Sequence, residues 1–387
     1  GDHAPAQMLL KAEDRYKPHP AFPLNTQVCL DCGLIEIADQ IPADFFRHYL
    51  YIPSGAATMH THFAGFADVL TARAAGGLIV DIGCNDGLLL AACNDRGGKT
   101  LGIDPAANIA ELANEKGVEV FVDYFHPATA QVVRDQYGPA KIICTTNTFN
   151  HIGDLHTFMK GVDILLADDG AFVIEVPRAK EMIDHNEFEN IYHEHVSEFS
   201  LLSMVKLGEF FDLEVTDVTH LPHIHGGSMR VFLTRKAAQF PTTAEVGRML
   251  DEEMAGGMLQ AETYDALAKR VDEMGKELLA MLDKLKAEGK KIVGYGASAR
   301  GNTLLTYYGI DTKYLDFLVD KNPLKHNMVA PNTRIPVYPV EKLEEEKPDV
   351  LFMLAWNFFD EVRAQQAAFE ARGGQFLVPL PTPRLVP

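Results

Sequence analysis

The chain has 387 residues, a formal net charge of −19, 47% hydrophobic residues and 23% charged residues. This length suffices for two or three domains that each bury a core. The acidic balance argues against nucleic-acid binding, because a phosphate backbone would be repelled. The sequence lacks the run of about 18 apolar residues typical of a membrane span, and its start carries no signal-peptide pattern. The five cysteines, an odd number, suit a reducing compartment and not a disulfide framework, so we expect a cytoplasmic protein. We also expect no membrane contact.

Residues 1–68 are rich in loop-forming residues and carry the pair Cys29 and Cys32. This CxxC spacing supplies two ligands, whereas a structural zinc ion needs four. His3 and His19 are the residues that could complete the set. A redox pair is the alternative, but such a pair usually opens a helix in a thioredoxin-like unit, and no such unit is predicted here.

Apolar strand candidates alternate with helix-like stretches across residues 69–242. The first four candidates predict βαβ units and therefore a parallel sheet. The expected strands are Leu78–Ile82, Thr100–Ile103, Ile142–Thr145, Ala171–Val176 and Met229–Thr234.

Residues 243–288 are predicted to be a helical linker, with a break at Gly256 and Gly257. The strand pattern then restarts, so residues 289–387 are expected to form a second α/β domain. Its expected strands are 291–296, Tyr314–Val319, Asp349–Leu354 and Gln375–Val378.

A candidate ligand site lies where a buried strand, a turn and a helix start follow one another. Glycine in such a turn lets the backbone approach a ligand, because it has no Cβ and tolerates positive φ. About twenty residues later a second strand ends in Asp104, where a carboxylate can accept hydrogen bonds from both ribose hydroxyls. The turn residues are Asp81, Gly83, Asn85, Asp86 and Gly87.

The acidic character of this turn favours S-adenosylmethionine over a dinucleotide. A dinucleotide site has a GxGxxG turn whose amides hold a pyrophosphate. S-adenosylmethionine carries two cationic groups and no phosphate, so nearby carboxylates attract it. A structural turn whose glycines serve only packing is the alternative. Further cofactor contacts are expected near strand ends, where ligands of open α/β sheets bind. They are Asp123, Tyr124, Phe125 and Asn147.

Two polar clusters are candidates for chemistry. In the first, Tyr192–His195, a histidine with a pKa of about 6.5 can act as general base. A tyrosine hydroxyl can stabilise an oxyanion, and a glutamate can orient the imidazole. The spacing is not HExxH, which excludes a zinc-protease site; a solvated polar loop is the alternative. The second, His223–Arg230, contains paired glycines that indicate either a close backbone approach or a plain turn.

The second α/β domain opens with a strand, a turn and a helix start between Gly294 and Asn302. A helix N-terminus favours anions, and basic residues near the strand ends are a candidate patch for a nucleotide diphosphate. Scattered surface charge is the alternative. An NAD-linked oxidoreductase is disfavoured because the turn lacks GxGxxG and a downstream acid. The basic residues are Arg300, Lys321, Lys325 and Arg334, and Trp356 and Asn357 could contact a sugar or base.

The chain resembles, essentially end to end, the nucleotide-sugar C-methyltransferases of antibiotic deoxysugar pathways. The resemblance implies a class I methyltransferase-like Rossmann domain, a second C-terminal Rossmann-like α/β domain and a small N-terminal zinc-type domain. The shared stretches are Tyr49–Ser54, Asp81–Leu90, Asn147–Ile152, Ile191–Ser197, Gly226–Val231, Gly294–Ala297 and Gly301–Leu304.

The resemblance also implies a mechanism. In that family a keto group acidifies the neighbouring C–H, a histidine removes the proton, and the enolate carbon attacks the sulfonium methyl group. Carried over, His195 is the base and Glu194 sets its orientation, with His193 as the rival for the base. Tyr192, His193 and His151 lie near the keto or enolate oxygen.

The remaining contacts implied by the resemblance come from both ends of the chain. Tyr49 and Tyr51 close over the cofactor or substrate from the N-terminal domain. The C-terminal domain binds the nucleotide-sugar. Its expected substrate contacts are His225, Tyr295, Ser298, Arg300, Asn302, Lys325, Trp356 and Asn357.

This sequence departs from the family pattern at several positions. The family has a second CxxC pair before the residues that match Gly1–Pro5, so we expect the zinc site to be incomplete here. Arg300 replaces a common lysine, Glu198 a common aromatic residue and Asp81 a common glutamate. O-methylation of a sugar or other small keto substrate is the alternative reaction, and a non-catalytic nucleotide-sugar or zinc scaffold is the alternative class. We expect a monomer or small homo-oligomer.

Overall fold

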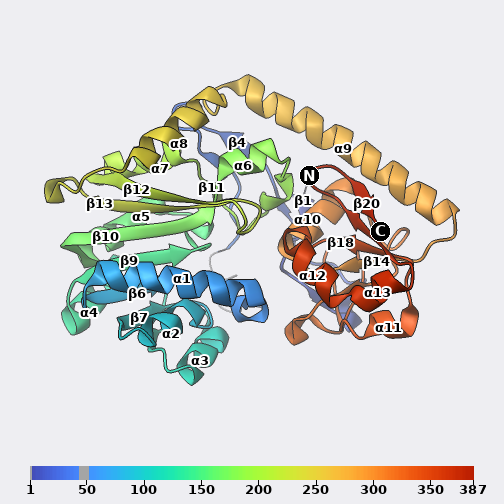
Figure 1. Ribbon diagram of the computed structural model, residues 1–387, viewed down its shortest axis with the longest axis horizontal. Coiled ribbons are helices and arrows are strands. Elements are labelled where there is room, and N and C mark those ends of the chain that lie inside the picture. Colours follow the sequence, from blue (N-terminus) through green and yellow to red (C-terminus); the bar gives the residue numbers. More distant parts are fainter. Residues whose placement is uncertain (1, 43–51) are drawn as a thin grey trace.

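The structure, a computed structural model, describes residues 2–42 and 52–387. It contains a seven-stranded sheet built from residues 78–235 and a six-stranded sheet built from residues 292–386. Figure 1 shows the two sheets side by side, with the long helix α9 running from one to the other across the top. Within the described residues, no helix combines the length and apolar character needed to cross a membrane.

The larger sheet has the order β12-β13-β10-β9-β6-β7-β8. Numbered along the chain from β6, its parallel strands follow the order 3-2-1-4-5 of doubly wound folds. The hairpin β12–β13 extends it, with β13 antiparallel to both neighbours. The strands are β6 (Leu78–Ile82), β7 (Lys99–Ile103), β8 (Val120–Phe121), β9 (Ala140–Thr146), β10 (Leu166–Pro177), β12 (Leu213–Leu221) and β13 (Ser228–Arg235).

Each of the five expected strands in this region is confirmed. Strand β12 was not expected, because a bulge between Val215 and Asp217 interrupts its alternation of apolar residues.

Helices cover both faces of this sheet because successive strand residues point to opposite sides. On β6, Ile79 packs with α1 (Ala57–Ala74) and α2 (Leu88–Asn94), whereas Val80 packs with the helices of the other face. Helix α1 therefore belongs to this layer, and it crosses residue 68, where the sequence suggested a boundary. The other helices of this part are α3 (Ala107–Glu115), α4 (Pro127–Tyr137), α5 (Leu155–Leu165), α6 (Ala179–Asp184) and α7 (Leu201–Phe210).

The smaller sheet has the order β17-β15-β14-β18-β19-β20, with only β20 antiparallel to its neighbour. Of the expected strand Tyr314–Val319 only the last two residues are extended, because the amides of Tyr314 and Leu315 bond to the carbonyl of Asp311 in a turn. The strands are β14 (Ile292–Tyr295), β15 (Leu318–Val319), β17 (Val337–Tyr338), β18 (Val350–Met353), β19 (Gln375–Val378) and β20 (Arg384–Val386). The helices are α10 (Ala299–Tyr308), α11 (Lys342–Glu346), α12 (Phe359–Gln365) and α13 (Ala367–Ala371).

Two helices connect the sheets, α8 (Ala244–Ala255) and α9 (Ala261–Ala287). The expected break is confirmed at Gly257, whose φ of 73° ends the first helix. Helix α9 buries one stripe of apolar residues at helical spacing, which fixes its rotation against the six-stranded part. The stripe is Leu267, Val271, Met274, Leu278, Leu282 and Leu285.

The N-terminal segment pairs with both halves of the molecule. Strand β2 (Leu10–Lys11) joins β16 (Met328–Val329) of the C-terminal part, while β5 (Ile35–Ile37) joins β11 (Ser197–Glu198). The remaining strands here are β1 (Asp2–His3), β3 (Phe22–Pro23) and β4 (Thr26–Val28). Short 3-10 helices are η1 (Ala12–Asp14), η3 (Pro53–Gly55), η4 (Phe149–His151), η5 (Phe188–Asn190), η6 (Lys236–Ala238), η7 (Pro323–Lys325) and η8 (Trp356–Phe358).

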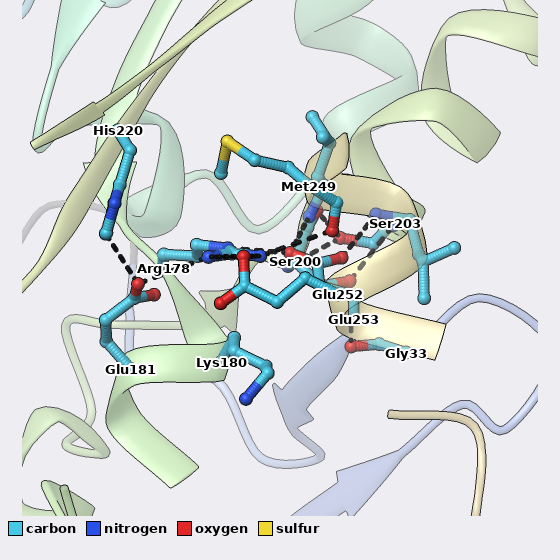
Figure 2. A network of polar contacts seen from close by, with 12 residues as sticks. Gly33, Arg178, Lys180, Glu181, Ser200, Ser203, His220, Met249, Glu252 and Glu253 are labelled. Carbon is cyan, nitrogen blue, oxygen red and sulfur yellow. Dashed lines mark hydrogen bonds and ion pairs between the residues drawn. The ribbon is translucent and has the colours of Figure 1, made fainter. Parts of the chain in front are cut away.

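A buried ion pair holds these parts together, as Figure 2 shows. Arg178, fully buried directly after β10, donates from Nε to Glu253 Oε1 of α8 at 2.8 Å. The two oxygens of Glu253 also accept the backbone amides of Leu201 and Leu202, at 3.0 and 2.9 Å. A carboxylate here satisfies amides at the first turn of α7 that have no partner within the helix.

The same network reaches the N-terminal segment through Ser200, the N-cap of α7. Its hydroxyl accepts the amide of Ser203 at 3.1 Å and lies 3.4 Å from the carbonyl oxygens of Cys32 and Gly33. Strand β10, helices α7 and α8 and the CxxC turn thus meet at one polar centre.

We expect Glu253→Ala to lower the free energy of unfolding by about 3 kcal/mol, because it removes the shortest ion pair of the buried Arg178, which keeps Glu181 and Glu252, and also removes the acceptor of the Leu201 and Leu202 amides. Glu245→Ala on the exposed side of the same helix is the matched control. It removes only an exposed pair with Arg248 and should change little. Urea unfolding followed by circular dichroism measures both. Equal midpoints for the two variants would contradict the role given to Glu253.

Candidate active site

A cavity of about 430 Å³ opens at the carboxyl edge of the seven-stranded sheet. Its walls come from the ends of β6, β7 and β9 and from the loops that follow them, as expected for an open α/β sheet. Tyr49 and Tyr51 lie outside the described residues. The expected site residues that line it are Asp81, Gly83, Asn85, Asp104, Asp123, Tyr124, Phe125, Asn147, His151 and His193.

The turn after β6 requires its glycines. Gly83 has a φ of 75°, and a Cβ there would lie 2.3 Å from Thr148 Oγ1. Gly87 does not line the cavity. Its φ is 73°, and a Cβ would lie 2.9 Å from that of Ala113, so this glycine lets α2 pack closely on α3. Gly83 is thus part of the cavity wall, whereas Gly87 permits the helix packing behind that wall.

Two buried acidic side chains line the cavity. Asp104 accepts the amides of Asn85 and Ala106, both at 2.9 Å, and burial raises its pKa. Burial raises the pKa of Asp81 to about 8, although a hydrogen bond from Cys144 opposes the shift. Among the described residues, Asp81 Oδ1 has no hydrogen-bond partner. A buried carboxylate with an unused oxygen suits a cationic ligand, so the residues present fit S-adenosylmethionine.

Beside this cavity, a buried loop after η5 holds the first polar cluster. The Tyr192 hydroxyl lies 2.5 Å from His195 Nε2, and the two rings are 4.0 Å apart. The ring of His151 is 5.1 Å from that of His195. Burial, with a smaller contribution from the charge of Arg300, lowers the pKa of His195 to about 3. The imidazole is therefore neutral at physiological pH, which a base requires.

Glu194, which the sequence predicts to orient His195, does not contact that imidazole within the described part of the chain and is bound elsewhere. Its Oε1 accepts the amide of Gln7 at 3.1 Å, and burial raises its pKa to about 7. The carboxylate that faces His195 is instead Glu198, whose Oε1 lies 3.1 Å from Nδ1. A turn from Tyr192 to His195 directs the intervening side chains away from the imidazole. The one signal in the sequence was the departure from an aromatic residue at position 198.

His193 occupies the wall between two cavities. Its Nε2 donates to the carbonyl oxygens of Phe22 and Pro23, at 3.0 and 3.2 Å, so the N-terminal segment fixes the ring. The second cavity, about 490 Å³, lies between that segment, α9 and α10, and Tyr192 also lines it. Asn302 lines the same cavity. Its Nδ2 donates to the carbonyl of Ala6, and Oδ1 has no partner among the described residues.

The expected anion patch of the C-terminal part is not formed by Arg300. The guanidinium is ion-paired with Glu187 at 3.0 Å and Glu189 at 2.5 Å, and it donates to the carbonyl of His225. It also lies 4.9 Å from the ring centre of Trp356, whose Nε1 donates to Glu189. Two carboxylates neutralise this cation, because a buried charge needs partners.

The other cations of the expected patch are also bound within the chain. Lys325 contacts Asp320 at 3.2 Å, and Lys321 contacts Glu361 at the same distance. Arg334 donates to the carbonyl of Arg15 in the N-terminal segment. Nearness in sequence therefore did not produce a free basic surface, and these three cations hold loops in place.

Four further expected substrate contacts have mainly local partners. The Ser298 hydroxyl accepts the amide of Gly301 as the N-cap of α10. Tyr295 is in the core of the smaller sheet, where burial raises its pKa to about 12. Burial lowers the pKa of His225 to about 4, and its ring meets Phe358 edge-on. Asn357 lies in η8 and is partly exposed.

Two residues beside the cofactor cavity, His62 and Glu175, were not predicted, and they form a network with Arg230 of the second candidate cluster. His62 Nε2 of α1 lies 2.5 Å from Glu175 Oε1, and Arg230 Nη2 lies 2.7 Å from Oε2. The backbone carbonyl of Glu175 accepts the amide of Asn147 in the cavity wall. Burial would raise the pKa of Glu175, but His62 and Arg230 hold it below its ordinary value. A glutamate within the apolar run of β10 was the signal.

The zinc expectation does not fit the residues present. Within residues 2–42 and 52–387, no group of three or more His, Cys, Asp or Glu side chains could hold a metal ion. Cys29 and Cys32 are free thiols in a turn closed by the amides of Cys32 and Gly33 on the carbonyl of Cys29. Two ligands do not make a structural zinc site.

Comparisons with known proteins show that the chain is similar to methyltransferases, which use S-adenosylmethionine. The family model described as "Methyltransferase domain" matches residues 59–218, and that described as "C-methyltransferase C-terminal domain" matches residues 223–381. The C-methyltransferase NovU of Streptomyces niveus is 35% identical over 382 residues, which cover 98% of this chain and 91% of NovU. A ubiquinone biosynthesis O-methyltransferase of Maricaulis maris is 29% identical over 99 residues, 24% of this chain and 38% of that protein.

Solved structures align with about half of the chain. The CcbJ methyltransferase of Streptomyces caelestis has a TM-score of 0.37 at 11% identity and covers 51% of this chain and 96% of its own. The strand order and the match to the methyltransferase domain give the larger sheet the class I methyltransferase fold. From its similarity to NovU over nearly its whole length, the chain belongs to the C-methyltransferase family and is an S-adenosylmethionine-dependent enzyme.

Proposed function

We propose that this enzyme methylates a carbon next to the ketone of a nucleotide-linked deoxysugar, after His195 removes a proton from that carbon. The observation that carries the proposal is a neutral, buried imidazole bonded to a tyrosine that faces the second cavity. Carbon is a poor nucleophile, so C-methylation needs a base together with stabilisation of the enolate oxygen. O-methylation does not require both.

The cofactor would be held by the carboxylates of the first cavity. Asp104 would accept hydrogen bonds from the ribose hydroxyls, and Asp81, with its unused oxygen, would interact with a cationic group. Tyr124 and Phe125 supply apolar and aromatic surface for the adenine. When bound, S-adenosylmethionine supplies an electrophilic methyl group.

Tyr192 and His195 would act together on the acceptor. If the proton of the neutral imidazole is on Nδ1, the Tyr192 hydroxyl, 2.5 Å from Nε2, donates to that nitrogen. A keto oxygen that enters the second cavity can take this O–H, which both polarises the ketone and frees the Nε2 lone pair. His195 then accepts the proton from the adjacent carbon, and the Tyr192 hydroxyl stabilises the oxyanion that forms.

The second cavity is where we place the sugar. It shares His193 with the cofactor cavity, and its wall also carries Asn302, Thr303 and Thr306. Amide and hydroxyl groups of this kind match sugar hydroxyls, and the unpartnered Oδ1 of Asn302 is an acceptor that a hydroxyl would satisfy.

We expect Asp104→Asn to weaken binding of S-adenosylhomocysteine about tenfold to a hundredfold. The substitution removes charged hydrogen bonds to the ribose, which are worth about 1.5–3 kcal/mol. Isothermal titration calorimetry measures the affinity. Asp95→Asn, at the end of α2 and away from the cavity, is the control and should bind like the wild type. Unchanged affinity in a folded Asp104→Asn protein would remove the basis for the cofactor assignment.

We expect the wild type, saturated with S-adenosylhomocysteine in D₂O, to exchange the α-proton of a 4-keto-6-deoxyhexose linked to a nucleoside diphosphate. Thymine, uracil and guanine nucleotides would be compared by NMR. His195→Asn should slow exchange about 10²- to 10⁴-fold because the general base is lost. The exposed His156 gives a matched control, His156→Asn. Methylation of a sugar without any exchange would favour O-methylation.

A further inference from the structure

We propose that Glu198 is the positioning residue of the base: it holds a proton on Nδ1 of His195 and leaves Nε2 as the nitrogen that accepts the substrate proton. This inference rests on the proposed function, in which His195 deprotonates the acceptor. In the family that this sequence resembles, this position commonly holds an aromatic side chain.

Both ring nitrogens of His195 have a partner. Glu198 Oε1 lies 3.1 Å from Nδ1, and the Tyr192 hydroxyl lies 2.5 Å from Nε2. Contacts at opposite edges of an imidazole fix its plane as well as its tautomer, because the hydrogen bond at one nitrogen decides which one carries the proton. A carboxylate that accepts Nδ1–H makes Nε2 the acceptor, and the tyrosine O–H then has a lone pair to donate to.

The backbone of Glu198 is held by a sheet. Strand β11 pairs with β5, so that Glu198 is opposite Ile35, and the carbonyl of Val196 accepts the amide of Ile37 at 2.9 Å. The Glu198 side chain is 3% exposed. Its carboxylate therefore meets the imidazole in a fixed direction, while Glu194, closer in sequence, is bound to Gln7.

The charges around the pair explain how a carboxylate can be buried there. Burial raises the pKa of Glu198, the charge of Arg300 opposes the rise, and Glu187 adds to it. Arg300 also lowers the pKa of His195. The charged and titratable groups that contact or influence the pair are Tyr192 and Glu187 around η5, Arg300 on α10, His151 on η4 and His225 in the loop before β13, while Glu189 pairs with Arg300.

The raised pKa of Glu198 and the lowered pKa of His195 together determine how activity should depend on pH. A protonated imidazole beside Arg300 is stabilised only if Glu198 is ionised, so deprotonation of Glu198 switches the base on. Because the pKa of Glu198 is raised, activity should fall as the pH drops through that raised value. Without the carboxylate, only the lowered pKa of His195 remains, and the acid limb should move to lower pH.

The test compares Glu198→Gln and Glu198→Asp with Glu253→Gln, a matched change at a buried glutamate outside this pair. Thermal melting checks that each variant folds. The rate of α-proton exchange is measured against pH, with S-adenosylhomocysteine bound. For Glu198→Gln we expect a rate about 10²- to 10⁴-fold lower, since loss of a carboxylate that sets a histidine tautomer can lower turnover by about 10⁴-fold, and an acid limb at lower pH. Glu198→Asp should retain the limb at reduced rate, and Glu253→Gln should melt earlier with an unshifted limb.

A second readout needs no substrate. In protein labelled with ¹⁵N-histidine, the His195 signals are those missing from His195→Asn. In the wild type, the ¹⁵N chemical shifts of the His195 ring should change as Glu198 titrates, at a pH well above the ordinary pKa range of glutamate. This change should be absent in Glu198→Gln. An unchanged titration and an unchanged acid limb in that variant would overturn the inference. Absence of exchange with every sugar in the wild type would instead count against the proposed function, and the NMR titration would still decide the role of Glu198.

Discussion

The arrangement of this protein depends on the buried ion pair of Arg178 and Glu253. The carboxylate of Glu253 on α8 neutralises the guanidinium of Arg178, which directly follows β10, and it also accepts the amides at the start of α7. One side chain thus links the end of a strand to two helices. Ser200 extends it to the turn around Gly33. Because Glu253 is buried and serves three donors, its removal leaves the amides of Leu201 and Leu202 without their side-chain acceptor and weakens the pairing of Arg178. The loop with the catalytic candidates lies between Arg178 and Ser200, so both its ends are anchored by this network.

The same principle of paired buried charge sets the chemistry of the site. Burial is the main reason that the His195 imidazole is neutral, and the charge of Arg300, although paired with Glu187 and Glu189, lowers its pKa as well. On the cofactor side, no cation among the described residues pairs with Asp81 or Asp104, and burial raises the pKa of Asp81 to about 8. The side with His195 thus holds a neutral imidazole that can act as a base, and the side with Asp81 and Asp104 suits a positively charged ligand. His193 lines both cavities and lies between the two sides.

Local features were predictable from the sequence, and long-range pairings were not. The βα turn at Gly83 and the carboxylate Asp104 follow from strand, turn and helix signals within a few residues, and the structure places both in one cavity. The partner of Arg300 could not be predicted, because it comes from a segment more than a hundred residues away. Glu198 could not be preferred over Glu194 without knowing how the turn at His195 directs each side chain.

The pairing of β5 with β11 has a thermal consequence. Glu198 keeps its direction only while the short hairpin β4–β5 stays in register with it. Small hairpins are marginally stable by themselves, and parts of a protein open locally at lower free energy than the whole molecule. Loss of this hairpin would release the carboxylate from the imidazole while both large sheets remain intact. The upper temperature limit of catalysis would then be set by a sub-global opening of the N-terminal segment, below the temperature at which the sheets melt.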